Sequence, residues 1–171
     1  PAAGTLGASS AYNTVVEVQV NGGTAGASVT SVTVERFGLS IDTNIAGVLV
    51  VDANGNRHGN VLTLADNVVT IPFTSDPITA PAGGSTTFKV QAHIGSTGTA
   101  GTIGFKVTGM NGTPSGLPVM GNLNSLAATT STLGTLTVDQ NNLSITNAVS
   151  VDIGRTDYVL AKFRLVAGAN E

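Results

Sequence analysis

Apolar and polar residues alternate with a period of two along most of this chain. The clearest case is TTFKVQAHI at 86–94, where apolar side chains are separated by Lys89, Gln91 and His93. Successive side chains of a strand point to opposite faces, so the pattern predicts a strand with one buried face. Comparable patterns or short apolar runs occur near residues 16, 32, 48, 61, 68, 103, 136, 149 and 161.

Turn-forming residues separate these segments. Such residues follow or divide apolar runs at Asn21-Gly22-Gly23, at 52–56 and at Asp66-Asn67. The chain contains 22 glycines in all. No segment shows the 3.6-residue period of a helix. Roughly ten short strands with frequent turns predict an all-β fold, an antiparallel immunoglobulin-like β-sandwich with Greek-key connections. A closed barrel is the alternative.

The end of the chain carries a separate strand pattern. Ala161, Phe163 and Leu165 alternate with Lys162 and Arg164. We therefore expect an N-terminal arm at 1–14, a sandwich domain at 15–157, and a terminal strand at 158–171 that pairs with a neighbouring copy or begins another repeat.

This terminal strand resembles an earlier part of the same chain. AKFRLVAGANE at 161–171 has apolar residues 145 positions after those of VEVQVNGGTAGAS at 16–28, with Phe163 matching Val18 and Leu165 matching Val20. Two arrangements fit the match. The chain is either part of a tandem array, or a subunit whose last strand occupies the first-strand position of a neighbour.

Composition narrows the classes of function. Only 10% of the residues are charged, the net charge is −3, and the seven Lys and Arg are scattered. A nucleic-acid partner or an anionic membrane needs clustered positive charge, so neither is expected. No apolar run reaches the roughly 20 residues that a spanning helix needs, so membrane insertion is not expected either. The chain has no cysteine and no tryptophan.

Two longer stretches carry a family resemblance. SVTVERFGLSIDTNIAGVLVVDANGNR at 31–57 and ITAPAGGSTTFKVQAHIGSTGTAGTIGFKV at 78–107 resemble a β-sandwich repeat of large secreted bacterial cell-surface proteins, of the S-layer and adhesin-stalk kind. LGTLTV at 133–138 is similar to the seam between two such repeats. The resemblance implies a structural or adhesive role at the cell surface and carries no catalytic residues with it. His93 stands where such repeats usually have an acidic residue.

One turn has the residue types of a metal site. Asp52, Asn54 and Asn56 place side-chain oxygens at alternate positions, as the first half of a calcium loop does. The glycine is misplaced for an EF-hand and no glutamate closes the loop, so calcium would need a distant carboxylate such as Asp42. The alternative is a hairpin in which Asn54-Gly55 forms a tight type I′ turn.

Other candidate sites give weaker signals. His58 and His93 are expected to be exposed to solvent, and GSTGTAGTIG at 95–104 to be a loop leading into a strand. Asn111-Gly112-Thr113 and Asn142-Leu143-Ser144 match the acceptor pattern for glycosylation. No nucleophile elbow or phosphate loop occurs, so we expect no enzyme activity and no cofactor other than calcium.

These observations predict a non-enzymatic structural subunit or repeat of an extracellular assembly such as a filament, S-layer or stalk. Its partners would be copies of itself, arranged head to tail and joined by β-strand complementation through Ala161, Phe163 and Leu165. The alternative is an adhesin-like binding module that uses the loops at 110–132 and 42–47. A calcium-stabilised accessory domain of an enzyme is a third hypothesis.

Overall fold

A computed structural model describes residues 1–111, 116–128, 136–139, 153–154 and 164–167. Strands dominate these residues, with one short 3-10 helix, η1 (Asp42–Asn44). The predicted all-β class is therefore confirmed. The chain divides into two compact units, Pro1–Ser131 and Thr132–Glu171.

The first sheet of unit 1 collects strands from distant parts of the sequence. Its order is β1-β12-β10-β4-β7, and β11 also pairs with β10. All its pairings are antiparallel except that of β1 with β12, which is parallel. The strands are β1 (Thr5–Gly7), β4 (Ser31–Phe37), β7 (Val68–Pro72), β10 (Thr102–Met110), β11 (Val119–Met120) and β12 (Asn124–Ala127).

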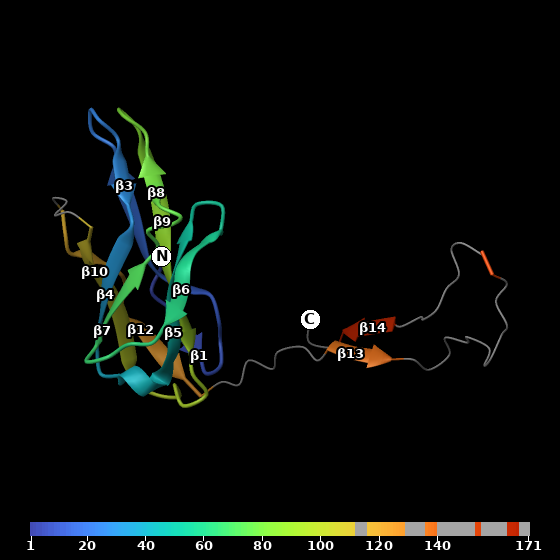
Figure 1. Ribbon diagram of the computed structural model, residues 1–171. Coiled ribbons are helices and arrows are strands. Elements are labelled where there is room, and N and C mark those ends of the chain that lie inside the picture. The colour runs from blue at the N-terminus through green and yellow to red at the C-terminus, as the bar shows by residue number, and fades with distance from the viewer. Residues whose placement is uncertain (112–115, 129–135, 140–152, 155–163, 168–171) are drawn as a thin grey trace. The chain divides into compact units, whose positions relative to one another are not determined.

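The second sheet has four antiparallel strands in the order β2-β9-β5-β6. They are β2 (Asn13–Asn21), β5 (Ile45–Asp52), β6 (Arg57–Leu62) and β9 (Ser85–Ile94). A further antiparallel pair, β3 (Ala27–Val29) with β8 (Ile78–Ala80), projects at one end of the unit (Figure 1).

The core lies between the two sheets and follows the alternation in the sequence. In β9 the residues Phe88, Val90, Ala92 and Ile94 are buried, and the intervening residues are not. The same alternation buries Val16, Val18 and Val20 in β2, Val32 and Val34 in β4, and Ile103, Phe105 and Val107 in β10. These side chains form one continuous apolar cluster, which makes the unit a sandwich of two packed layers.

The first residues of the chain belong to both layers. β1 lies in the first sheet, and the chain then crosses to the second, where the N–H of Ser9 donates to the carbonyl of Gly95 (3.3 Å). The sequence had assigned 1–14 to an arm, but these residues supply a strand and the start of β2. The immunoglobulin-like order with Greek-key connections stays a prediction.

Unit 2 contains a two-stranded antiparallel ladder among its described residues. β13 (Leu136–Asp139) pairs with β14 (Arg164–Ala167), with Val138 opposite Leu165. The division between the units therefore falls at residue 131, whereas the sequence had placed the end of the sandwich at residue 157. Among the described residues, no helix is long and apolar enough to cross a membrane.

Candidate functional site

The proposed calcium loop forms the turn between β5 and β6. The Asp52 Oδ1 accepts hydrogen bonds from the N–H groups of Asn54 and Asn56, both 2.8 Å long. The Asn56 side-chain amide donates to Asp52 Oδ2 at 3.0 Å. The three predicted residues thus lie together, but the carboxylate oxygens of Asp52 accept protein hydrogens. The calcium site stays a prediction, and this geometry supports a structural turn.

The turn differs from the predicted type I′ geometry. The N–H of Gly55 donates to the carbonyl of Asp52 at 3.1 Å, so Ala53 and Asn54 occupy the central positions. Gly55 has the positive φ of 88°, and Asn54 does not. A type I′ turn needs positive φ at both central residues, so the prediction for Asn54-Gly55 was wrong. Hydrogen bonds to the Asp52 carboxylate stabilise a turn one residue earlier.

Both histidines are less exposed than the sequence predicted. His58 is 7% exposed, and its Nδ1 lies 2.7 Å from the carbonyl oxygen of Asp76 and 3.1 Å from Asp76 Oδ2. Its Nε2 is buried without a hydrogen-bond partner, 3.9 Å from Asp52 Oδ2. His93 is half-buried, with its ring edge-on to Tyr12. Among the described residues, no three His, Cys, Asp or Glu side chains gather as a metal site.

A buried arginine joins three segments at one end of the sandwich. Arg36, at the end of β4, is 8% exposed, and its Nε donates to Asp42 Oδ1 at 2.7 Å. Its two terminal nitrogens donate to the carbonyl of Ser40 and to the side-chain oxygen of Asn67. The N–H of Asn67 donates to Asp42 Oδ2 at 2.8 Å. This set, which we call the arginine cluster (Arg36, Ser40, Asp42 and Asn67), fixes the start of η1. The sequence had offered 42–47 as a binding loop, but these residues form η1 and the first part of β5.

The cluster controls the ionisation of Asp42. Partial burial acts to raise the pKa of the Asp42 carboxyl. The hydrogen bond from the Asn67 N–H and the Arg36 guanidinium outweigh that effect, so the pKa of Asp42 is held below its ordinary value. The carboxylate therefore stays charged at neutral pH, as a partner for a buried guanidinium must.

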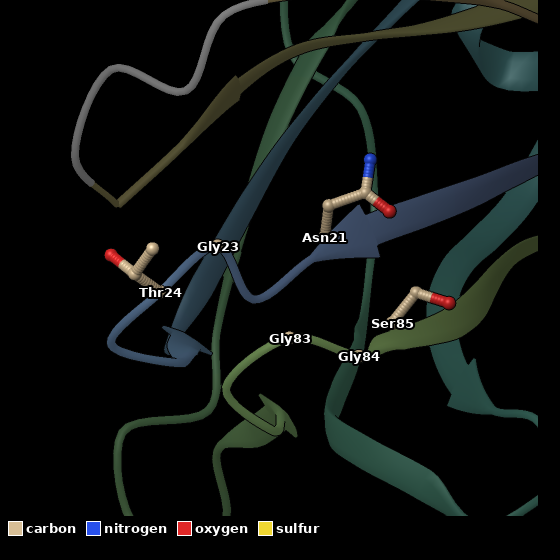
Figure 2. A pocket seen from close by; sticks show the side chains of 6 residues that line it. All are labelled: Asn21, Gly23, Thr24, Gly83, Gly84 and Ser85. Carbon is tan, nitrogen blue, oxygen red and sulfur yellow. The ribbon is translucent and has the colours of Figure 1, made fainter.

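An open hollow lies at the tip of the sandwich between two glycine-containing turns (Figure 2). The N–H of Gly83 donates to the carbonyl of Gly23 at 2.6 Å, and the N–H of Gly22 to that of Gly84 at 2.9 Å. A Cβ on Gly22 would lie 2.0 Å from the Pro81 carbonyl oxygen, so only glycine allows this approach. The hollow offers backbone groups and three uncharged polar side chains, those of Asn21, Thr24 and Ser85.

A second concave surface, which we call the β2 groove, runs beside one sheet edge. Its β2 wall is Val18–Asn21, and its opposite wall includes Met110, Leu117 and Val119. Val18 and Val20 are buried core residues, while Gln19 and Asn21 point to solvent. Within the described residues β2 pairs only with β9, so its other edge is free of strand partners there. Polar and apolar groups line the groove in similar measure, with the apolar ones on the wall opposite β2.

Of the residues predicted for the assembly strand, the structure describes Leu165. Leu165 is in β14 and is 56% exposed, and its cross-strand neighbour Val138 is 61% exposed. Ala161 and Phe163 lie outside the described residues. Two apolar side chains on one face of a hairpin are thus left largely in contact with water.

One predicted glycosylation site is engaged in the fold. The side-chain amide of Asn111 donates to the carbonyl of Ser28 at 3.0 Å, and its oxygen accepts the N–H of Thr30. The nitrogen that would carry a glycan thus holds the end of β10 against the β3–β4 connection. Asn142 lies outside the described residues.

Comparisons with protein-family models, with curated proteins and with solved structures gave no match. The resemblance to surface-protein repeats therefore stays a prediction.

Sequence reasoning missed the arginine cluster and the β2 groove. Arg36 follows the alternation of β4 on the buried face, and an arginine in an inward position is a signal that could have been noticed. The groove had no comparable signal, because it depends on which strand ends at the edge of a sheet.

Proposed function

We propose that this protein is a non-enzymatic structural subunit or repeat of an extracellular surface assembly. Copies would join head to tail by β-strand complementation through unit 2. The supporting observation is the exposed apolar face of its hairpin, at Val138 and Leu165. A two-stranded pair by itself is marginally stable in water, so β13 and β14 would gain stability by pairing with strands of another copy or repeat.

The use of charged groups in unit 1 fits a structural role. Arg36 and Asp42 fix a loop, Asp52 stabilises a turn, and Lys106 pairs with Glu35 on the neighbouring strand at 2.8 Å. Each of these groups stabilises backbone or sheet rather than facing an open cavity. An extracellular location rests on the low charge and on the resemblance to surface-protein repeats.

The test compares the full chain with the double variant Val138→Asp/Leu165→Asp by light scattering and electron microscopy over a range of concentrations. We expect the natural chain to grow with concentration and the variant to stay monomeric, because each aspartate would have to lose its hydration on docking. The matched control is Leu39→Asp, at an apolar side chain of unit 1 that is 84% exposed. If all three proteins stay monomeric, or all assemble equally, the proposal fails.

The hollow of Figure 2 favours a second candidate, an adhesin-like binding module. Its ligand would bind the turns at 21–24 and 83–85 rather than the loops that the sequence suggested. The expected signature is a chain that stays monomeric at every concentration and loses surface adhesion in Thr24→Asp. Adhesion that is unchanged by Thr24→Asp would contradict this candidate.

A further inference from the structure

The β2 groove has the form of an acceptor site for one more strand. An unpaired strand edge presents a row of N–H and C=O groups that can pair with another chain. Along Val18–Asn21 this edge lies beside apolar side chains of the opposite wall, Met110, Leu117 and Val119. A strand added here would gain main-chain hydrogen bonds on one side and apolar contacts on its inner face.

In unit 2, β13 pairs with β14, a strand whose sequence resembles that of β2. β14 matches β2 at the 145-residue spacing, which places Leu165 at the position of Val20 and Val166 at that of Asn21. In unit 2 the β14 strand is paired antiparallel with β13. The chain therefore contains two similar strands in different situations. β14 is paired with β13, whereas one edge of β2 has no strand partner among the described residues.

We infer that β13 of a second copy of this chain docks into the β2 groove. This inference rests on the proposed function and names the joint between copies. Transferring the β13–β14 register to β2 puts Val138 opposite Val20, Thr137 opposite Asn21 and Asp139 opposite Gln19. The strand that β13 leaves is then β14, which overlaps the terminal strand 158–166 that the sequence had assigned to the joint.

This register agrees with the inward and outward faces of β2. Residues opposite each other in a ladder share a face, so Val138 would share the inward face of Val20. Positions 137 and 139 fall opposite Asn21 and Gln19, which are both exposed. Val138 would thus lie on the face of the added strand that looks toward the apolar wall of the groove. A register shifted by one residue would place Asp139 inside.

Exchange of partners explains why β13 would leave its own hairpin. In that hairpin Val138 and Leu165 are largely exposed, whereas the groove offers a second wall of apolar side chains. β13 would pair with β2 through the same edge that now pairs with β14. Each joint between two copies therefore requires one β13–β14 pair to separate. The donor and acceptor surfaces are different parts of the chain, so the contact is heterologous and continues from copy to copy.

Cysteine cross-linking tests the register directly, because the natural chain has no cysteine. One protein carries Asn21→Cys and the other Thr137→Cys, and the two are mixed under mild oxidation. Residues opposite each other in an antiparallel pair lie within disulfide reach. The matched control replaces Asn21→Cys with Glu17→Cys, on the same exposed face of β2 but four residues further along. Non-reducing gels and mass spectrometry of the linked peptides measure the mixed dimer.

We expect about tenfold more mixed dimer from Asn21→Cys than from Glu17→Cys, because only the first pair has disulfide geometry. Equal yields would overturn the register. A chain carrying both Asn21→Cys and Thr137→Cys that links only within itself would overturn the second-copy occupant. If Val138→Asp/Leu165→Asp prevents assembly while the cysteine pair fails to link, the proposed function stands and this joint does not.

Discussion

At the scale of single residues, the arginine cluster is the most demanding feature of the fold. A guanidinium that has lost most of its water must be paired, because removing one partner leaves an uncompensated charge. Arg36 meets this requirement with three acceptors from two segments: Ser40 and Asp42 after β4, and Asn67 in the turn before β7. The hydrogen bonds from Arg36 hold these neighbours in position, and the neighbours in turn supply the acceptors that its buried positive charge requires.

We predict that Asp42→Asn lowers the free energy of unfolding by about 1.5–3 kcal/mol, because it removes a charged hydrogen-bond partner of Arg36. Urea titration of the full chain at neutral pH measures the loss. The control is Asp66→Asn, at an exposed carboxyl in the neighbouring turn, which should change the unfolding midpoint little. Equal losses in the two variants would contradict a specific role for the Asp42 charge.

The same pair predicts a dependence on pH. The folded-state pKa of Asp42 is lowered, so its contribution is fully present above the unfolded-state pKa of about 3.9 and is lost as pH falls through the folded-state pKa. The difference in unfolding free energy between the natural chain and Asp42→Asn should therefore shrink below about pH 4. A difference that stays constant down to pH 2 would contradict this assignment.

The histidines show why residue environments escape sequence reasoning. His58 directly follows an exposed turn and an exposed arginine, yet its ring is buried against Phe73 and Asp76. These contacts come from a loop 15 to 18 residues later in the chain, which no local pattern identifies. Local alternation predicts the face of a strand but not what covers that face.

At the scale of elements, turns depend on the conformation of one or two residues. Asp66 and Asn67 both have positive φ, 51° and 67°, and mutual hydrogen bonds of 2.9 and 3.0 Å join Ala65 and Val68. This is type I′ geometry, at the Asp-Asn pair rather than at Asn54-Gly55 where the sequence had placed it.

We predict that Asn67→Ala destabilises unit 1 by about 1 kcal/mol more than Asn67→Gly, because alanine is strained at this φ and glycine is not. Both variants lose the side-chain oxygen that accepts from Arg36, so their difference isolates the backbone effect. Thermal unfolding of both proteins gives the comparison. Alanine equal to or better than glycine would rule out left-handed strain at this position.

The Asp52 turn gives a prediction that separates a structural role from calcium binding. Asp52→Ala should cost about 1–2 kcal/mol, comparable to the loss of a capping side chain, since it removes three hydrogen bonds. The loss should be the same with millimolar calcium and with a chelator. A melting temperature that rises with calcium in the natural chain, and not in Asp52→Ala, would instead support the calcium site.

Strand positions were predictable because alternation reports burial directly. The period-two pattern marked most of the buried residues of β2, β4, β9 and β10, but it missed Val15, Arg36 and Gly104. Pairing was not predictable, because it joins strands far apart in the sequence. Gly104 illustrates the limit: the pattern gave it an outward position, but the ring of Phe37 lies over it from the neighbouring strand.

At the scale of the whole molecule, every described residue of the apolar core cluster belongs to unit 1. The strand patterns after residue 131 look like those before it, so the sequence extended the sandwich to residue 157. Membership of a core depends on long-range packing, and a strand that starts another unit has the same local pattern as one that ends the first.

We predict that a chain shortened to end at Ser131 keeps the urea midpoint of the full chain, since it retains the whole core cluster and all its sheet pairings. Circular dichroism under identical conditions measures both midpoints. A large fall in the midpoint, or loss of cooperative unfolding, would show that residues after 131 stabilise the first unit.

The parallel pairing of β1 with β12 has a mechanical consequence. Thr5 lies opposite Ser125 and Gly7 opposite Ala127, so the chain enters unit 1 beside the strand by which it leaves. Tension applied between the two ends pulls these strands in opposite directions along their length. The bonds of the ladder then carry the load together in shear, rather than opening one after another. A row of such units under flow or traction would resist stretching through this three-residue strand pair.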